Sequence, residues 1–460
     1  MIQHRRLMVS AIALGVLLSL WERGLVSPSR AEEFQNVPIF LRASDVLPRE
    51  ILSGPNYVVR ETVRNDGLVN TYDIETQGGI LTVESTDLLL KRIAELNALW
   101  KLQELKRISI YGESFKNTAL SPVRTVTGVV TGPVQTVKGV GTGVGNFFTK
   151  AGAAITSVGP DKDKLLEATL GQAAFRREFA FKLGVDPYTR YEPLQKELTE
   201  VSWTAAAGDL TVQAAFSAIP GVGGGVISLL VTADAMRKLV RDKTSPEIEK
   251  INRKSLYDMD VVDPLAGSFL SSTTYSPQEK TLLVGALASM AGVKDRGVFV
   301  ESAAIDYYEE SVALFMRICA EMASQYCAKK GGVERFVNAG GILFLLTKDR
   351  VVVGLFSLDH VAWTVNFARQ ETQVSDAIEK MPDIKGKELW ISGTVDPVAR
   401  RALESKGWIV EERVNDRLRA QEGKEAPTTA EDAPPRPEEI DQLRAPATEH
   451  GVTDGPMNMK

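Results

Sequence analysis

The chain is poor in the residues that most often bind metals or carry out catalysis. Its 460 residues include three histidines, and only His360 stands in a segment that we expect to fold. A zinc site built on histidine pairs is therefore excluded from the folded regions. A lone histidine after a strand is most simply a structural residue. We expect no metal, and no residue pattern identifies a catalytic group.

Cysteine is equally scarce. Cys319 and Cys327 are the only two, and both fall in a helix that we expect to span 303–329. Eight residues along a helix cover about 12 Å, whereas the Cα atoms of a disulfide are roughly 4.4 to 6.8 Å apart. The two thiols are therefore not expected to bond to each other. They are interpreted as small core residues, with a redox or inter-chain role as the alternative.

Signals for nucleotide or nucleic-acid binding are missing too. The glycine cluster at 139–143 has no preceding strand, lacks the spaced third glycine of a dinucleotide-binding loop, and is not followed by Gly-Lys-Ser/Thr. The net charge is −5 and the longest basic run is 4–6, which argues against a general nucleic-acid binder. We expect no cofactor and no nucleic-acid partner.

No acidic residue occurs between Glu113 and Asp161, and this interval holds an eleven-residue repeat. The sequence PVRTVTGVVTG at 122–132 is followed at once by PVQTVKGVGTG, and a degenerate third unit fills 144–154. Eleven residues make three turns of a slightly relaxed α-helix with one apolar and one polar stripe. The residues that we expect to contact a membrane or a partner are Val123, Val126, Val130, Val134, Val137, Val140, Val144, Phe147, Phe148, Arg124, Lys138 and Lys150.

A second interval, 210–233, contains no ionisable residue. It is long enough for a transmembrane helix. However, the run PGVGGG at 220–225 stands in its middle, where each glycine costs about 1 kcal/mol and proline about 3 kcal/mol in a helix. We therefore expect a buried helical hairpin. A hairpin that inserts into a bilayer and a simple spanning helix are the alternatives.

The two ends of the chain are not expected to belong to the fold. Residues 1–31 have the pattern of a signal peptide, with a basic start, an apolar run at 7–21, and small residues at 29 and 31 before a cleavage site. A retained anchor is the alternative. The Glu/Pro/Ala/Thr-rich segment 416–460 is expected to be disordered. The sequence thus predicts an exported protein, periplasmic or at the periphery of an envelope membrane.

The remaining sequence predicts an α+β fold. Residues 32–118 form an α+β domain in which a β-meander at 57–83 precedes a helix that begins at Thr86. The repeats at 119–160 separate it from a helical domain, 161–332, which contains the hydrophobic hairpin. A small α/β domain follows at 333–415, where Asp396 is expected to start a helix and Gly407 to end it, between two strands.

Several segments resemble those of a bacterial family of exported proteins with no assigned activity. They are YVVRETVRNDGLVNTYDI at 57–74, LGVDPYTRYEPLQKELTEVSW at 183–203, SPQEKTLLVGALASMAGV at 276–293 and RRALESKGWIVEE at 400–412. The resemblance implies export and a shared fold, and it transfers no site residues. Separately, the repeats are similar to the amphipathic lipid-surface helices of synucleins and lipid-droplet coat proteins, which implies contact with anionic lipid.

These observations favour a non-enzymatic envelope protein. It would be peripherally membrane-associated, or act as an adaptor or scaffold, through the repeats, with a membrane surface or another envelope protein as partner. One alternative is a periplasmic enzyme that uses carboxylates in an interdomain cleft, which several close, buried acids in one large pocket would favour. The other is a membrane-inserting protein that uses the 210–233 hairpin.

Overall fold

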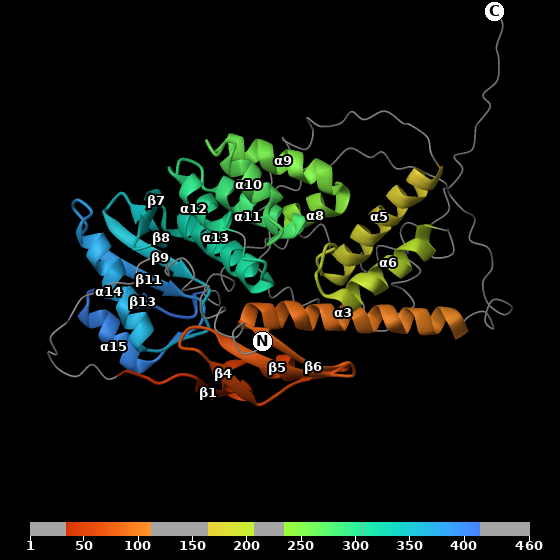
Figure 1. Cartoon of the computed structure of the whole chain (residues 1–460), viewed down its shortest axis with the longest axis horizontal. Helices are drawn as coiled ribbons and strands as arrows, with labels where there is room; N and C mark the ends of the chain where they lie inside the picture. The colour runs from red at the N-terminus through yellow and green to blue at the C-terminus, as the bar shows by residue number, and fades with distance from the viewer. Residues whose placement is uncertain (1–33, 112–163, 207–233, 306, 415–460) are drawn as a thin grey trace, which may run out of the picture. The chain divides into compact units, whose positions relative to one another are not determined.

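The computed structural model describes residues 34–111, 164–206, 234–305 and 307–414 (Figure 1). The signal peptide, the repeats with all twelve contact residues named above, the 210–233 hairpin and the C-terminal segment lie outside the described residues. The described part is α+β, as the sequence predicts: an antiparallel sheet comes first, helices follow, and a second sheet with two covering helices ends the fold.

The N-terminal region is the predicted antiparallel meander, with one correction. The sequence YVVRETV at 57–63 predicts a single strand, but two strands lie there, and they pair with opposite ends of the same partner, β5 (Asn70–Thr76). Between them the N–H of Arg60 donates to the carbonyl of Asp73. The elements are β1 (Ile39–Arg42), α1 (Ala43–Val46), α2 (Arg49–Leu52), β2 (Ser53–Gly54), β3 (Tyr57–Val59), β4 (Thr62–Asn65), β5 (Asn70–Thr76) and β6 (Gly79–Glu84), in the order β1-β4-β5-β3-β2 with β6 also paired to β5.

The turn between β4 and β5 is closed by Asp66 and Gly67. Asp66 Oδ1 accepts hydrogen bonds from the N–H groups of Leu68 (2.9 Å) and Val69 (2.8 Å). Gly67 has φ +103°, and a Cβ there would lie 2.7 Å from Thr364 Cγ2. Only glycine suits that conformation and that close approach, so this turn can contact the C-terminal region.

The middle of the described chain is helical. The sequence predicts one helix over 303–329, but that helix begins later: α12 (Arg296–Ala303) ends where it was expected to start, and α13 (Glu310–Lys330) follows after a non-helical connection. There the N–H groups of Tyr307 and Tyr308 donate to Thr274 Oγ1 instead of continuing a helix (3.2 and 3.3 Å). The helices are α3 (Thr86–Tyr111), α5 (Lys164–Leu183), α6 (Glu192–Ala206), α8 (Asp234–Asp242), α9 (Ser245–Tyr257), α10 (Leu265–Ser271), α11 (Pro277–Ser289), α12 (Arg296–Ala303) and α13 (Glu310–Lys330).

The C-terminal region is a mixed five-stranded sheet of order β13-β11-β9-β8-β7. The predicted strand-helix-strand unit is confirmed: β11 and β13 are parallel, Asp396 accepts from the N–H of Val398 (2.8 Å), and Gly407 has φ +84°. The elements are β7 (Val333–Ala339), β8 (Ile342–Thr347), β9 (Val351–Phe356), β10 (His360–Val361), α14 (Val365–Glu379), β11 (Gly386–Ile391), β12 (Thr394–Val395), α15 (Pro397–Ser405) and β13 (Trp408–Glu411); β10 and β12 form a separate parallel pair.

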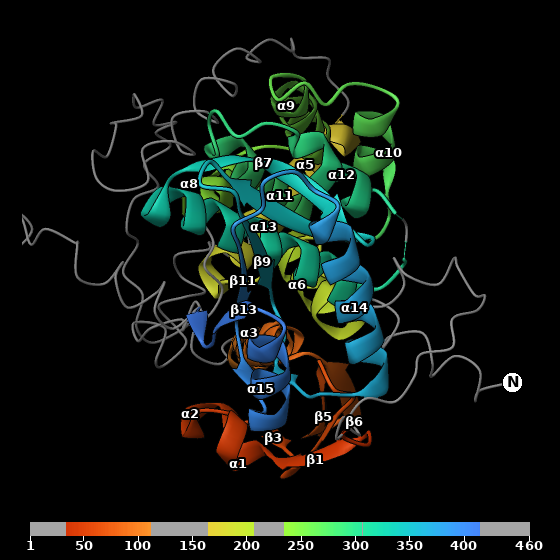
Figure 2. The same cartoon turned by 90° about the vertical axis from the view of Figure 1, so that its left-hand side faces the viewer.

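Helices cover both faces of this sheet. The helices α14 and α15 lie on one face and α12 and α13 on the other (Figures 1 and 2). Side chains of each pair belong to the hydrophobic cluster on their own side of the sheet. The larger hydrophobic cluster also contains side chains from the N-terminal sheet and from α9 to α11. A third cluster lies between α3, α5 and α6. The larger cluster therefore joins the N-terminal sheet, the central helices and one face of the C-terminal sheet in one core.

Candidate functional site

The histidine and the cysteines occupy structural positions. His360 Nδ1 lies 2.9 Å from Thr394 Oγ1, and burial holds the pKa of His360 below its ordinary value. Cys319 and Cys327 both lie on α13 and are free, which confirms that they do not bond to each other. Burial raises the pKa of Cys319 to about 12 and that of Cys327 to about 11. Both thiols are therefore protonated near neutral pH and are poor nucleophiles.

The C-terminal sheet contains a cavity of about 150 Å³. Its lining comes from both faces of the sheet. Phe299, Cys319, Ala323, Phe336, Leu345 and Val353 line it on the side of α12 and α13. Phe344, Val374, Leu389, Leu403 and Trp408 line it on the side of α14 and α15.

The cavity crosses the sheet because β8 and β9 separate. Their register covers two pairs next to the hairpin, Leu345 with Val353 and Leu346 with Val352. Beyond these pairs the two strands diverge, although β9 stays paired with β11 along its whole length. Leu343, Phe344, Leu355 and Phe356, which flank the opening, all line the cavity. The space is therefore continuous from one face of the sheet to the other.

Gly354 makes room for aromatic rings at this opening. A Cβ at this position would lie 2.6 Å from Phe356 Cε2 and 2.9 Å from Phe344 Cε1. The two rings pack edge to face with their centroids 5.9 Å apart, and the ring of Phe344 also stacks on Trp408 at 6.1 Å. The missing side chain thus lets three aromatic rings meet where the strands part.

The lining is apolar, and its few polar side chains have partners. Ser302 Oγ donates to the carbonyl of Val298 (3.3 Å). Glu371 Oε1 accepts from Trp408 Nε1 at 2.8 Å, and its other oxygen lies 3.3 Å from Lys406 Nζ. An empty apolar cavity destabilises a fold by about 24 cal/mol per Å³, so this one would cost roughly 3 to 4 kcal/mol if nothing filled it. The cavity wall can therefore make apolar contacts with a ligand.

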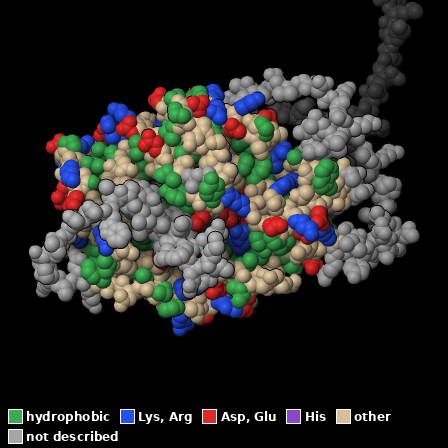
Figure 3. Space-filling model, in the orientation of Figure 1, with side chains coloured by type: hydrophobic (Ala, Val, Ile, Leu, Met, Phe, Trp, Pro, Cys, Tyr) green, Lys and Arg blue, Asp and Glu red, His purple; other side chains and the backbone are tan. Residues whose placement is uncertain are grey.

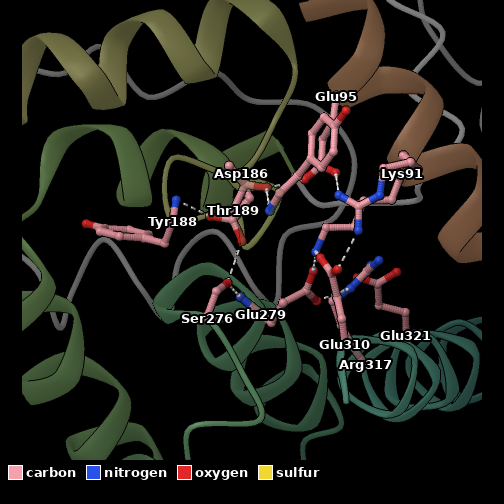
Figure 4. Close-up of polar contacts among 12 residues, drawn as sticks. Lys91, Glu95, Asp186, Tyr188, Thr189, Ser276, Glu279, Glu310, Arg317 and Glu321 are labelled. Atoms are coloured by element: carbon pink, nitrogen blue, oxygen red, sulfur yellow. Dashed lines mark hydrogen bonds and ion pairs between the residues drawn. The ribbon is translucent and has the colours of Figure 1, made fainter. Parts of the chain in front are cut away.

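A second group of side chains forms a buried charge network between α3, α11, α13 and the 184–191 loop (Figure 4). At its centre Lys91 Nζ lies 3.1 Å from Glu279 Oε1 and 3.0 Å from Glu310 Oε1. The other oxygen of Glu279 lies 2.6 Å from Arg317 Nε, and Arg317 also pairs with Glu321 (2.7 Å). Two carboxylates thus each bridge Lys91 to an arginine, because Glu310 also pairs with Arg92 at 2.8 Å.

The network continues toward α5 and α6. Arg92 pairs with Glu95, which in turn accepts a hydrogen bond from Thr189. Beside them Asp186 accepts from the N–H of Tyr188 (2.8 Å) and from Ser276 Oγ (2.5 Å). The hydroxyl of Ser276 also accepts from the N–H of Glu279 and so begins α11. These contacts fix the loop and three helices against one another.

The pKa values in the network follow from burial and pairing. Burial acts against the charged form of Lys91, but Glu279 and Glu310 more than offset it and hold the Lys91 pKa above its ordinary value. The pKa values of Glu279 and Glu310 are lowered because their cations outweigh burial. At Glu321 the effect of burial is larger than that of the nearby Arg317, and the pKa of this carboxyl group is raised to about 7.

These buried acids do not line the cavity. Within the described residues, the carboxylates are close together and buried, but they face cations, and Glu371 is the acidic side chain in the cavity wall. The arrangement predicted for an enzyme, several free acids in one large pocket, is not what the described part of the chain presents. Ion pairs of this kind hold helices in a fixed register.

Elsewhere on the described surface, charges of both signs are interspersed with apolar side chains (Figure 3). Among residues 34–111, 164–206, 234–305 and 307–414, no group of three or more His, Cys, Asp or Glu side chains could hold a metal ion. None of the helices in these ranges is both long enough and apolar enough to cross a bilayer. No family model, curated protein or solved structure matches this chain.

Sequence reasoning missed both features. The partners in the charge network stand far apart in the chain: Lys91 and Glu279 are 188 positions apart. The cavity had one local signal, Gly354, because a glycine inside an apolar strand marks a bulge or a close approach. The glycine indicates a local irregularity of the strand, but it does not indicate that the pairing between β8 and β9 ends there.

Proposed function

We propose that this protein is a non-enzymatic, exported envelope protein that attaches to the periphery of a membrane through residues 119–160. The folded regions serve as the scaffold that the repeats anchor. The proposed partner of the repeats is an anionic lipid surface. A second envelope protein is the alternative partner, and the experiment below distinguishes the two.

The positions of three helix ends, those of α3, α5 and α6, support this proposal. The helices α3 and α6 run in the same direction, because Arg92 lies over the ring of Tyr191 at 4.6 Å while Lys106, further along α3, pairs with Glu197 of α6 at 2.5 Å. The C-terminal ends of α3 and α6 therefore lie at the same end of this helical layer.

The start of α5 lies at that end as well. The 184–191 loop connects α5 to α6, and the two helices pack side by side in opposite directions (Figure 1). Segment 112–163 therefore leaves and re-enters the fold at one end of the layer, and segment 207–233 leaves from the same end. A surface bound there would meet both the repeats at 119–160 and the interval 210–233, neither of which contains an acidic residue.

The chemistry of the repeats favours lipid over a protein partner. The valine stripe supplies apolar area without acidic residues, and each of Arg124, Lys138 and Lys150 would add about 1 kcal/mol at an anionic surface. Valines and glycines alone bury too little area to order thirty or more residues in water. A bilayer interface supplies the missing apolar contact.

Vesicle flotation of the full chain tests the proposal. We expect the protein to float with phosphatidylglycerol vesicles, less with phosphatidylcholine vesicles, and to be released at high salt. Val137→Asp should abolish flotation because it places a charge on the apolar stripe. Thr142→Asp adds the same charge to the polar stripe and should retain most of the binding.

Two results would contradict the proposal. If the unaltered chain does not float with anionic vesicles, contact with lipid is wrong, and crosslinking to one envelope protein in its place would identify the adaptor role. If Val137→Asp and Thr142→Asp weaken flotation equally, net charge alone drives binding and the repeat stripe has no part in it.

A further inference from the structure

We propose that the cavity between β8 and β9 binds one unbranched alkyl chain, held without a covalent bond. This site is formed entirely by described residues and does not depend on the membrane attachment proposed above. The chemistry required is a saturated hydrocarbon chain, whether it belongs to a free amphiphile or to a lipid.

The volume is sufficient for such a ligand. The cavity measures about 150 Å³. An apolar cavity of roughly 150 Å³ lined by Leu, Ile and Phe stays dry and takes up small apolar molecules. Natural interiors are close-packed and rarely leave a void of this size. The cavity is therefore large enough for several methylene groups and is unlike an ordinary packing defect.

The shape selects a chain over a ring. The lining runs from Cys319 and Ala323 on α13, through the opening between the strands, to Leu403 on α15. A space that crosses a sheet between two strands is elongated along the direction of crossing. A flexible chain one methylene wide can follow this path, whereas a compact ring would be stopped by Phe344 and Phe356 at the opening.

The polarity of the wall defines which end of the ligand enters. Ser302 and Glu371 are engaged with protein partners, so the wall leaves no polar group waiting for a ligand. Phe315, Ile342 and Phe367 are among the half-buried side chains in the lining, and all three pack against the cluster on the side of α14 and α15. We place the mouth there, where a polar head group would remain in water while the chain lies inside.

Calorimetric titration of the full-length protein with 1-octanol tests the site. We expect saturable binding with a negative heat-capacity change, which marks the burial of apolar surface. Cyclooctanol has the same number of carbons and one hydroxyl, but it is a ring, and should bind about tenfold more weakly or worse. Monomeric dihexanoylphosphatidylcholine serves as the lipid probe. Saturable binding of the alcohol alone indicates a free amphiphile, and binding of both indicates that a lipid chain can enter.

Substitutions that fill the cavity with a larger side chain can be compared with matched substitutions outside the lining. Ala323→Leu extends a side chain into the cavity from α13, and should weaken octanol binding about tenfold or more while raising the unfolding midpoint. Ala320→Leu makes the same change on the same helix at a buried position outside the lining, and should lower the midpoint by overpacking. Val374→Leu fills the other side of the sheet and should also weaken binding if the cavity is continuous.

Cys319 gives an independent readout if a variant fails to fold. In a Cys327→Ser background it is the only thiol in the chain and it lines the cavity. At alkaline pH, where a larger fraction of this thiol is ionised, octanol should slow its reaction with methyl methanethiosulfonate. The proposal is overturned if octanol neither binds saturably nor protects Cys319, or if cyclooctanol binds as tightly as octanol. A loss of binding in Ala323→Leu with no change in Val374→Leu would show that the site does not cross the sheet.

Discussion

Asp359 Oδ1 lies 3.1 Å from the backbone nitrogen of Thr86, a residue 273 positions earlier in the chain. The same carboxyl group accepts a hydrogen bond from the N–H of Asn70 at 2.8 Å. Thr86 is the first residue of α3, so a side chain from the C-terminal region caps this helix at its positive end. One buried carboxyl group thus joins the meander, the long helix and the C-terminal region.

We expect Asp359→Ala to lower the free energy of unfolding by about 2 to 4 kcal/mol. The substitution removes a helix cap and leaves two N–H groups without an acceptor. Urea denaturation followed by circular dichroism would measure the loss. Asp349→Ala, in the exposed hairpin between β8 and β9, is the control and should change stability by less than about 0.5 kcal/mol. Equal effects of the two substitutions would contradict this account.

The same residue makes stability depend on pH. Burial raises the Asp359 pKa from 3.8 to about 7 although the N–H donors of Asn70 and Thr86 oppose the shift. Since the folded pKa is the higher one, its contribution is fully present below about pH 4 and is lost as the pH rises through 7. Glu84 and Glu321, whose pKa values burial also raises to about 7, act in the same direction.

Asp359→Asn isolates that contribution. Asparagine does not ionise, so the difference in stability between the unaltered protein and the variant should shift in favour of the variant by about 1 kcal/mol or more between pH 4 and pH 8. Urea midpoints measured across this range would show it. A difference that stays constant with pH would mean that Asp359 is ionised throughout.

The buried pairs of Lys91 allow a prediction about the charge network. Lys91→Met should destabilise the fold by about 3 to 5 kcal/mol, because Glu279 and Glu310 would each lose a partner in a place water does not reach. Lys106→Met is the matched control: that lysine also faces two glutamates, but its side chain is one-third exposed, and the loss should be about 1 kcal/mol or less. Similar thermal midpoints for the two variants would show that the network is solvated.

The end of α15 depends on Gly407. With φ at +84° and no neighbour closer than 3.9 Å to an added Cβ, this position is limited by backbone conformation and not by space. Gly407→Ala should therefore destabilise the protein by about 1 to 2 kcal/mol. Gly386→Ala, where the added Cβ makes ordinary contacts and φ is not positive, should change stability little. Denaturant midpoints for both variants test this.

The expected leader can be checked directly. Intact-mass measurement of natively exported material should show a chain that begins at Glu32. Material that still carries Met1 after export would contradict the predicted cleavage and favour a retained anchor.

Elements determined by neighbouring residues could be predicted from the sequence. Asp396 and Gly407 mark the two ends of one helix within twelve residues, so capping chemistry alone is sufficient to place it. The hairpin of β8 and β9 and the turn at Gly67 follow in the same way. The break between α12 and α13 could not be predicted, because it depends on the hydroxyl of Thr274, more than thirty positions away.

The candidate site was less predictable than the fold. An apolar strand such as VVVGLF reads as a buried strand whether or not its neighbour pairs with it. Where the pairing of β8 with β9 ends, the rings of Phe344, Phe356 and Trp408 pack together, and they come from three strands. Pattern within one strand carries no information about such packing, and the same holds for Lys91 and its acidic partners.

The cap that Asp359 provides also sets an order of events during synthesis. Ribosomes add roughly 5 to 20 residues per second, so α3 is complete for many seconds before the residue that caps it exists. Until then the N–H of Thr86 lacks this acceptor, although the meander, α6 and α13 are already present to cover the helix. The nascent chain therefore lacks the hydrogen bonds that join the meander and α3 to the C-terminal region until its final quarter has been made, and this late closure would suit the export proposed above.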